Sequence, residues 1–263
     1  MKKMLQQLEV IIKNLAEQEI MPRYNRVAFE LKTDGSLVTE ADTAMQHAVA
    51  EALSKRWPEY ALLGEEMSEQ EQQALLDSHD AQGLWVLDPL DGTSNFASAI
   101  PIFSVSLALL QQDEVKLGLI YDPVRQECFS AIKGQGAWLN GRKLKLQVDK
   151  SSLNQCIAQV DFKRLPKAMA IHIAEKHPYA SQRNFGSGAL DWCWLATARS
   201  QLYIHGGQKL WDYLAGQLIL SEAGGLAETF EGENIFKKQL IKRSVVASVN
   251  RDLLNKWKAA IKV

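Results

Sequence analysis

Apolar residues in the first half of the chain follow two different periods. Leucine and isoleucine recur at helical spacing through residues 5–15, which predicts a helix that ends at about Ile20. Short apolar runs at 61–63 and 84–87 predict buried strands, and each run ends in acidic residues. Apolar or alternating stretches between residues 103 and 132 then predict an antiparallel meander, because polar turns separate them.

The second half alternates between strand-like and helix-like segments, which is typical of layered α/β packing. We place the internal boundary at Lys150, between an N-terminal α+β half (1–150) and a C-terminal α/β half (151–263) that completes one compact unit. Residues 67–79 are polar and rich in glutamine, too poor in apolar side chains for a core, and we interpret them as a surface flap. Strands are expected at 157–162, 202–205, 226–230 and 244–249. Helices are expected at 167–175, 189–198 and 211–222, and a terminal helix after the last strand ends at about residue 260.

The run 84–96 (LWVLDPLDGTSNF) is the motif around which the chain is organised. Its Asp-Pro and Asp-Gly pairs predict a turn that leaves Asp88 and Asp91 at the C-terminal tip of a buried strand. Residues 92–95 are suited to cap a following helix, whose first backbone N–H groups would face the same place. Two carboxylates beside such a helix start indicate a site at which a metal ion binds next to a phosphate group. An isolated motif of this kind is usually only a polar turn, so the interpretation depends on the rest of the chain.

Other acidic residues stand at the edges of apolar elements. Thr39 is expected to cap a helix with Asp42 at its third position, Glu66 follows the strand at 61–63, and Asp212 begins an apolar helix. Each has an ordinary explanation as a capping or solvent-exposed acid. Together they offer the oxygen ligands that Mg²⁺ takes and shares with substrate phosphate. Paired Mg²⁺ ions in such a cluster would activate water for an in-line displacement.

Composition narrows the classes of function. The formal net charge is −1 and no stretch is strongly basic, which argues against nucleic acid as a partner. The 3 cysteines form no CxxC motif, which argues against disulfides or a zinc site and fits a reducing cytoplasm. The longest apolar stretches, such as 102–110, are far too short to span a bilayer. We therefore expect a soluble cytoplasmic protein with no membrane partner.

Nearly end to end, the chain resembles the inositol monophosphatase family, within the magnesium-dependent, lithium-sensitive phosphatases. The resemblance implies an α-β-α-β-α sandwich of the inositol monophosphatase and fructose-1,6-bisphosphatase type, commonly a homodimer, with two or three Mg²⁺ ions per site. The last two of its motifs are individually specific. The motifs are 38–42 (VTEAD), 64–66 (GEE), 85–96 (WVLDPLDGTSNF) and 211–225 (WDYLAGQLILSEAGG).

The same resemblance implies roles for single residues. Asp88 would be shared between two ions, Thr93 and Asp42 would orient the attacking water, and Glu65 belongs with them in the catalytic group. The metal ligands would be Glu66, Asp88, Asp91, Asp212 and the Leu90 carbonyl. The substrate would be held by Gly92, Thr93, Asp212, Ser187, Gly188, Ala189, His205 and Lys32, the last matched only across a gap.

A phosphatase of this kind has several possible substrates. The first expectation is inositol 1-phosphate, a small phosphorylated polyol hydrolysed by a metal-activated water. Relatives with the same motifs act on fructose 1,6-bisphosphate, histidinol phosphate or 3′,5′-bisphosphonucleotides, and these remain alternatives. A different class of function is an interaction protein that keeps the fold and uses its surface for a partner.

One substrate position departs from the family. Inositol-specific members carry an acid seven positions before the Trp-Asp aspartate, where this chain has His205. A neutral imidazole offers one acceptor, whereas a carboxylate accepts several hydrogen bonds, which are roughly twice as strong. We therefore expect relaxed specificity, and we expect His205→Glu to raise kcat/KM for inositol 1-phosphate relative to glycerol 2-phosphate. In the alternative, His205 points away and Asp191 contacts the substrate.

Overall fold

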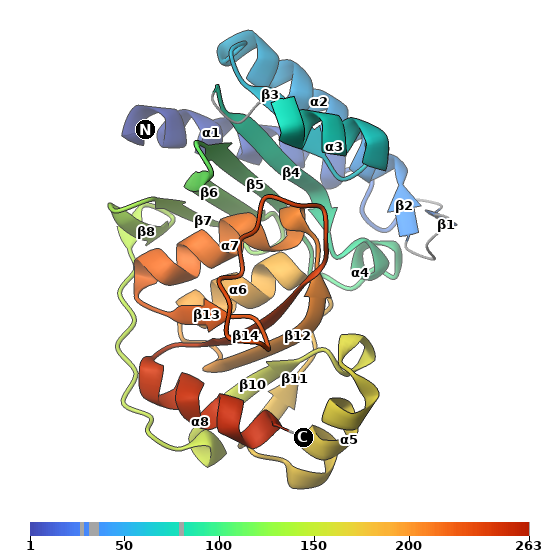
Figure 1. Ribbon diagram of the computed structural model, residues 1–263. Coiled ribbons are helices and arrows are strands. Elements are labelled where there is room, and N and C mark those ends of the chain that lie inside the picture. The colour runs from blue at the N-terminus through green and yellow to red at the C-terminus, as the bar shows by residue number, and fades with distance from the viewer. Residues whose placement is uncertain (27–28, 32–36, 79–81, 263) are drawn as a thin grey trace.

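Alternating layers of helix and sheet make up the protein, as Figure 1 shows for this computed structural model. The structure describes residues 1–26, 29–31, 37–78 and 82–262. A first helical layer covers one sheet, a second helical layer separates the two large sheets, and a third covers the other sheet. This α-β-α-β-α arrangement confirms the expected fold class. The layers hold α1 (Lys2–Leu15) and α2 (Glu40–Arg56), then α6 (Gly188–Ala196) and α7 (Leu210–Ala223), then α5 (Lys167–Lys176) and α8 (Arg251–Ile261).

The first large sheet has the strand order β3-β4-β5-β6-β7-β8-β9. Strands β3 and β4 are parallel and the later pairs are antiparallel, which confirms the predicted meander. Asn140 (φ 48°) and Gly141 (φ 76°) form the tight turn between β8 and β9, as an Asn-Gly pair predicts. The strands are β3 (Ala61–Gly64), β4 (Leu84–Asp91), β5 (Ser104–Gln111), β6 (Glu114–Asp122), β7 (Glu127–Ile132), β8 (Gly136–Leu139) and β9 (Arg142–Lys143).

The second large sheet has the strand order β11-β10-β12-β14-β13. Strand β10 is parallel to both of its neighbours, whereas β14 is antiparallel to both of its own. A separate small sheet pairs β1 (Phe29–Leu31) with β2 (Leu37–Thr39). The strands of the second sheet are β10 (Ile157–Val160), β11 (Ser181–Arg183), β12 (Leu202–Gln208), β13 (Leu226–Glu228) and β14 (Arg243–Ser248).

Helix α7 is buried between the two large sheets because its sequence is apolar on nearly every face. It packs closely on α6, its neighbour in the same layer. A Cβ atom added at Gly216 would lie 2.4 Å from the Cβ of Trp192, so only glycine permits this approach. Gly216 is therefore a point at which the two helices pack closely, against Trp192.

Some elements differ from the sequence expectations. Residues 69–78 form helix α3 (Glu69–Ser78), whose Leu76 is 1% exposed within the core, so the interpretation of this stretch as lacking core contacts was wrong. Helix α1 continues as a π-helical segment (Ala16–Ile20), which agrees with the predicted end at Ile20. Short helical turns occur at α4 (Thr93–Ala97), η2 (Leu153–Gln155) and η3 (Phe162–Arg164).

The structure can be compared with the sequence expectations on membrane spans, thiols and the internal boundary. No helix in the described parts of the chain is both long enough and apolar enough to cross a bilayer. Cys128, Cys156 and Cys193 are buried free thiols. The two large sheets lie on either side of residue 150 in the sequence, and the division into halves there stays a prediction.

Candidate active site

Acidic side chains from three elements converge where β4 ends. Asp88 and Asp91 belong to β4, and Glu65 follows the parallel strand β3, with its amide donating to the Leu87 carbonyl at 3.1 Å. Asp212 lies in the first turn of α7. Burial raises the pKa of Asp88 most, and the charges of Glu65, Asp91 and Asp212 raise it further, so the four acids are neighbours. We call these four residues the carboxylate cluster.

A bulge in β4 brings its two aspartates to the same region. Asp88 pairs with Ser106 and Asp91 with Ser104, so β4 has one more residue than β5 between these pairs. Residues three apart on a regular strand point to opposite faces, and an extra residue reverses that alternation. Pro89 lies inside the bulge, where a residue without an N–H group costs no ladder hydrogen bond.

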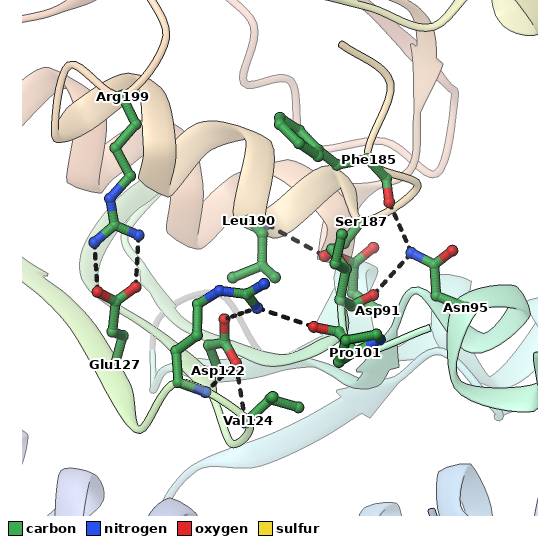
Figure 2. A network of polar contacts seen from close by, with 12 residues as sticks. Asp91, Asn95, Pro101, Asp122, Val124, Glu127, Phe185, Ser187, Leu190 and Arg199 are labelled. Carbon is green, nitrogen blue, oxygen red and sulfur yellow. Dashed lines mark hydrogen bonds and ion pairs between the residues drawn. The ribbon is translucent and has the colours of Figure 1, made fainter. Parts of the chain in front are cut away.

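Asp91 connects β4 to the start of α6, as Figure 2 shows. Its carboxylate accepts a hydrogen bond from the hydroxyl of Ser187, the residue beside it in Figure 2. It also accepts hydrogen bonds from the Gly188 amide at 3.2 Å and from the Ala189 amide at 2.9 Å. Burial raises the pKa of Asp91 to about 6, although these hydrogen bonds lower it. The three residues predicted to line the substrate site thus contact Asp91, and their contact with a substrate stays a prediction.

Asp212 both caps α7 and belongs to the carboxylate cluster. It accepts a hydrogen bond from the Lys209 amide at 2.8 Å, as expected of an acid that caps a helix. Burial raises its pKa to about 7, and the charges of Glu65 and Asp91 add to this increase. Helix capping therefore fixes the direction in which Asp212 enters the cluster.

Asp42 connects the start of α2 to the same region. Its Oδ2 accepts hydrogen bonds from the Thr39 amide at 2.8 Å and the Thr39 hydroxyl at 2.6 Å, which confirms the predicted cap. Its Oδ1 lies 3.2 Å from the Thr93 hydroxyl, which also lies 3.0 Å from the Leu90 carbonyl. A hydroxyl has a single proton, so Thr93 donates to one of these acceptors and keeps its lone pairs for another donor.

Glu65 and Glu66 are adjacent, but their charges affect the neighbouring aspartates to different extents. The charge of Glu65 raises the pKa of every aspartate in the carboxylate cluster. Burial raises the pKa of Asp42 to about 6, and there the charge of Glu66 has a larger effect than that of Glu65. This difference favours Glu65 as the glutamate of the cluster, whereas the Glu66 amide donates to Gln46 Oε1 on α2 at 3.1 Å.

The carboxylate cluster has the chemistry of a Mg²⁺ site. All of its donors are hard oxygens, and their mutual repulsion is of the kind that a divalent cation relieves. Within the described residues, no three histidine, cysteine, aspartate or glutamate side chains already adopt a metal-coordinating arrangement. Asp91 and Asp212 accept hydrogen bonds from protein groups instead, so ligation requires these oxygens to share or exchange those partners.

The other residues predicted to hold substrate lie in different surroundings. His205 is 7% exposed on β12, with its Nε2 3.4 Å from Asp161 Oδ2, so it is directed toward an acid. Asp191, the alternative contact, is 6% exposed in α6, and burial followed by the charge of Asp91 raises its pKa well above the ordinary value. Lys32 lies outside the described residues.

Asn95 has a structural role that the sequence analysis missed. Its side-chain amide donates to the Ile102 carbonyl at 2.8 Å and to the Phe185 carbonyl at 2.7 Å. Figure 2 shows the second of these bonds, which ties α4 to the loop before α6. A Cβ atom at Gly186 would lie 3.0 Å from the Asn95 amide nitrogen, so the fit is close. No local pattern indicates these bonds, because Phe185 is 90 residues away in the sequence.

The layered arrangement, with an acidic cluster beside a tight glycine turn, is the fold of the layered-sandwich phosphatases. The model of the inositol monophosphatase family matches residues 2–262, and the chain belongs to this family. The sequence resemblance is thereby confirmed.

Relatives and solved structures agree with this assignment. The chain is 35% identical to the Nus factor SuhB of Haemophilus influenzae, over 83% of this chain and 81% of the relative. It is 34% identical to the Nus factor SuhB of Escherichia coli K12, over 76% and 74% of the two chains. The extragenic suppressor protein SuhB of Bartonella henselae superposes with a TM-score of 0.85 at 27% identity, covering 99% of this chain and 98% of that one. The Thermotoga maritima inositol monophosphatase gives 0.84 at 26% identity, with coverages of 98% and 96%.

Proposed function

We propose that the protein is a Mg²⁺-dependent phosphomonoesterase that hydrolyses a small polyol or sugar phosphate, with inositol 1-phosphate as the first candidate. The observation that supports this most is the carboxylate cluster. Asp88 is buried, and Asp91 and Asp212 are partly buried. Removal from water, followed by the charges of neighbouring carboxylates, raises the pKa of all three, and groups perturbed in this way concentrate at functional sites. The membership of the family supports the same class of reaction.

In this proposal the carboxylate cluster and the Leu90 carbonyl hold two or three Mg²⁺ ions. Glu65 takes the ligand role that the family motif suggested for Glu66, because the charge of Glu65 acts on all the cluster aspartates. Glu66 then belongs with Asp42, beside the water-orienting group. When bound, the ions would supply an activated water and neutralise charge on the phosphate.

Thr93 and Asp42 are the residues that we assign to the attacking water. When the Thr93 hydroxyl donates to Asp42 Oδ1, its lone pairs are left to accept a hydrogen bond from water. The Thr39 hydrogen bonds hold the other oxygen of Asp42, so this carboxylate cannot rotate away without losing them. Deletion of either side chain would leave the water without its orienting acceptor.

The amides of Gly92 and Thr93 are the groups that we assign to the phosphate. Gly92 begins α4 with a φ of 93°, and a Cβ atom there would lie 2.9 Å from the Ile102 carbonyl. A glycine therefore lets the chain turn immediately after Asp91 and keeps its amides close to the cluster. Helix α4 has only 5 residues, so the individual amides matter here rather than a helix dipole.

A phosphate-release screen tests this function. The substrates are inositol 1-phosphate, fructose 1,6-bisphosphate, histidinol phosphate and a 3′,5′-bisphosphonucleotide, each with Mg²⁺ and with EDTA. We expect Mg²⁺-dependent release, highest for inositol 1-phosphate, with measurable hydrolysis of other phosphomonoesters. Absence of phosphate release from every substrate would contradict the proposed phosphatase function. Release that persists in EDTA would contradict the assignment of a metal-dependent reaction.

A second candidate function is that of an interaction protein, because the relatives in Haemophilus influenzae and Escherichia coli are named Nus factor SuhB. The two functions are compatible in one chain. We propose that any such role does not use direct nucleic-acid binding, since the net charge is −1. Titration of a fluorescent RNA at physiological salt should give no anisotropy change, and micromolar binding would contradict this view.

We also propose that the protein is a cytoplasmic homodimer. The buried free thiols are consistent with a reducing compartment, and the family resemblance suggests the dimer. Light scattering coupled to size-exclusion chromatography should give twice the chain mass of 29.5 kDa. A mass equal to a single chain at micromolar concentration would show a monomer.

A further inference from the structure

His205 and Asp161 face one another from two adjacent strands of the second sheet. Strands β10 and β12 are parallel, with Val160 beside Ile204, so the residue after each of these stands next to the other. His205 Nε2 lies 3.4 Å from Asp161 Oδ2. The residue found where the family carries an acid is therefore paired with an acid from the neighbouring strand.

The tautomer of His205 is fixed by the backbone. Its Nδ1 accepts a hydrogen bond from the Gly207 amide at 3.1 Å, so this nitrogen carries no proton. The ring proton is then on Nε2, and Nε2 is the nitrogen that faces Asp161. With 7% exposure, His205 is a buried group that orients a carboxylate rather than a freely accessible contact for a ligand.

Asp161 is held next to the carboxylate cluster. The turn that follows it, η3, presses against β12, since a Cβ atom at Gly206 would lie 1.7 Å from the Arg164 carbonyl oxygen. The charge of Arg164 lowers the pKa of Asp212, and the charge of Asp161 raises that of Asp191, which Asp91 also raises. Strand β12, which carries His205 beside Asp161, leads directly into the first turn of α7 with Asp212, so the pair lies on the second-sheet side of the cluster.

Asp161 also retains unused hydrogen-bonding capacity. Its Oδ1 is buried and has no hydrogen-bond partner, whereas the side chain as a whole is 21% exposed. Burial raises the pKa of Asp161, but the hydrogen bond from His205 and the charge of Arg164 outweigh burial and hold this pKa below its ordinary value. The other oxygen, Oδ2, lies 3.4 Å from His205 Nε2 and 3.8 Å from Arg164 Nε. A carboxylate that is ionised and partly accessible is suited to accept further hydrogen bonds from hydroxyl groups.

We propose that Asp161, positioned by His205, is the residue that recognises the hydroxyl groups of the substrate alcohol. The inference rests on the proposed phosphatase function and deepens it. The acid that inositol-specific relatives carry on the strand of His205 is supplied here from β10. The substrate class is therefore a phosphorylated polyol with a hydroxyl close to the phosphate-bearing carbon, and His205 is a positioning residue.

The test compares kcat/KM for inositol 1-phosphate with that for p-nitrophenyl phosphate, which has no alcohol hydroxyl. We expect Asp161→Asn to lower this ratio at least about tenfold, mainly through KM, which corresponds to one charge-assisted hydrogen bond. His205→Phe should lower the ratio similarly, and the double variant should show no further loss, because the two residues act as one unit. His205→Gln keeps an N–H donor and should recover part of the ratio. Asp149→Asn, an exposed aspartate in a loop, is the matched control.

The outcomes separate this inference from the function on which it rests. If the wild type releases no phosphate from any substrate, the proposed function fails. If the wild type is active and Asp161→Asn leaves the ratio unchanged while melting normally, Asp161 does not recognise the substrate. His205→Glu distinguishes direct from indirect recognition, because a glutamate would repel Asp161. We now expect this variant to lower the ratio, and an increase would restore direct recognition at position 205 and overturn the inference.

Discussion

The carboxylate of Asp88 is proposed to bind metal, and the same buried charge destabilises the metal-free protein. Asp88 is 2% exposed, and burial and neighbouring charges raise its pKa. In the unfolded chain its pKa returns to about 3.9, so the folded protein binds the proton more tightly. The free energy of unfolding of the metal-free protein therefore falls as the pH rises through the raised pKa of Asp88.

Asp88→Asn should consequently stabilise the protein in EDTA. An asparagine oxygen can still accept the Leu90 amide, which lies 3.1 Å from Asp88 Oδ1. We expect Tm to rise by a few degrees at pH 8 and by less at pH 5, since 1 kcal/mol corresponds to about 2–4 °C in a chain of this size. Calorimetry on both proteins measures this, with Asp149→Asn as the control. A lower Tm for Asp88→Asn at pH 8 would show that its charge is compensated by the protein alone.

The adjacent pair Glu65 and Glu66 allows a comparison in which residue type and region are matched. If Glu65 belongs to the carboxylate cluster, Glu65→Gln should raise the Mg²⁺ concentration needed for half-maximal activity at least about tenfold. Glu66→Gln should change this concentration less, because the charge of Glu66 acts on Asp42. Magnesium titrations of phosphate release measure both effects. The reverse order would return the ligand role to Glu66.

At the scale of elements, the contact between α6 and α7 determines how the two sheets are joined. Gly216→Val should destabilise the protein by about 1–3 kcal/mol, because added atoms would overlap Trp192. Ser221→Val, on an exposed position of the same helix, controls for the lower helix propensity of valine. Urea unfolding of both variants gives the comparison. Equal decreases in the free energy of unfolding would mean that α6 can move away from α7 without destabilising the protein.

Elements whose evidence is local could be predicted from the sequence. The meander, the Asn140-Gly141 turn and the Thr39 cap each depend on residues within a few positions, and all are observed. The order of strands in the second sheet was not predicted, because β14 lies between β12 and β13 through long-range pairing. The bulge in β4 escaped prediction for the same reason, since it is defined only by its register with β5.

In the candidate site, too, only the residues with a local sequence signal could be predicted. Its acids were found because each ends an apolar element, and Asp161 follows the same rule at the end of β10. The rule alone cannot say which acids meet, and the choice between Glu65 and Glu66 needs their three-dimensional neighbours. Asn95 had no such signal, because its partner Phe185 belongs to a distant loop.

For the whole molecule, a Mg²⁺ site in the carboxylate cluster predicts how phosphate release responds to other cations. Ca²⁺ prefers more ligands and longer bonds than the octahedral geometry of Mg²⁺, so it should occupy the cluster without supporting turnover. We expect equimolar Ca²⁺ to reduce Mg²⁺-supported phosphate release severalfold, and Li⁺ to inhibit as the family resemblance implies. Potassium chloride at the same ionic strength is the control. Equal activity with Ca²⁺ alone would contradict this.

The most direct test of the central claim is the Mg²⁺ dependence of phosphate release from inositol 1-phosphate by wild type and Asp88→Asn, measured side by side. We expect no phosphate release by the wild type in EDTA and saturable release with Mg²⁺. We expect a rate for Asp88→Asn lower by roughly a thousandfold or more at every Mg²⁺ concentration, since metal ligation contributes several kcal/mol to the transition state. Near-normal turnover by Asp88→Asn at saturating Mg²⁺, or wild-type release that persists in EDTA, would contradict the claim.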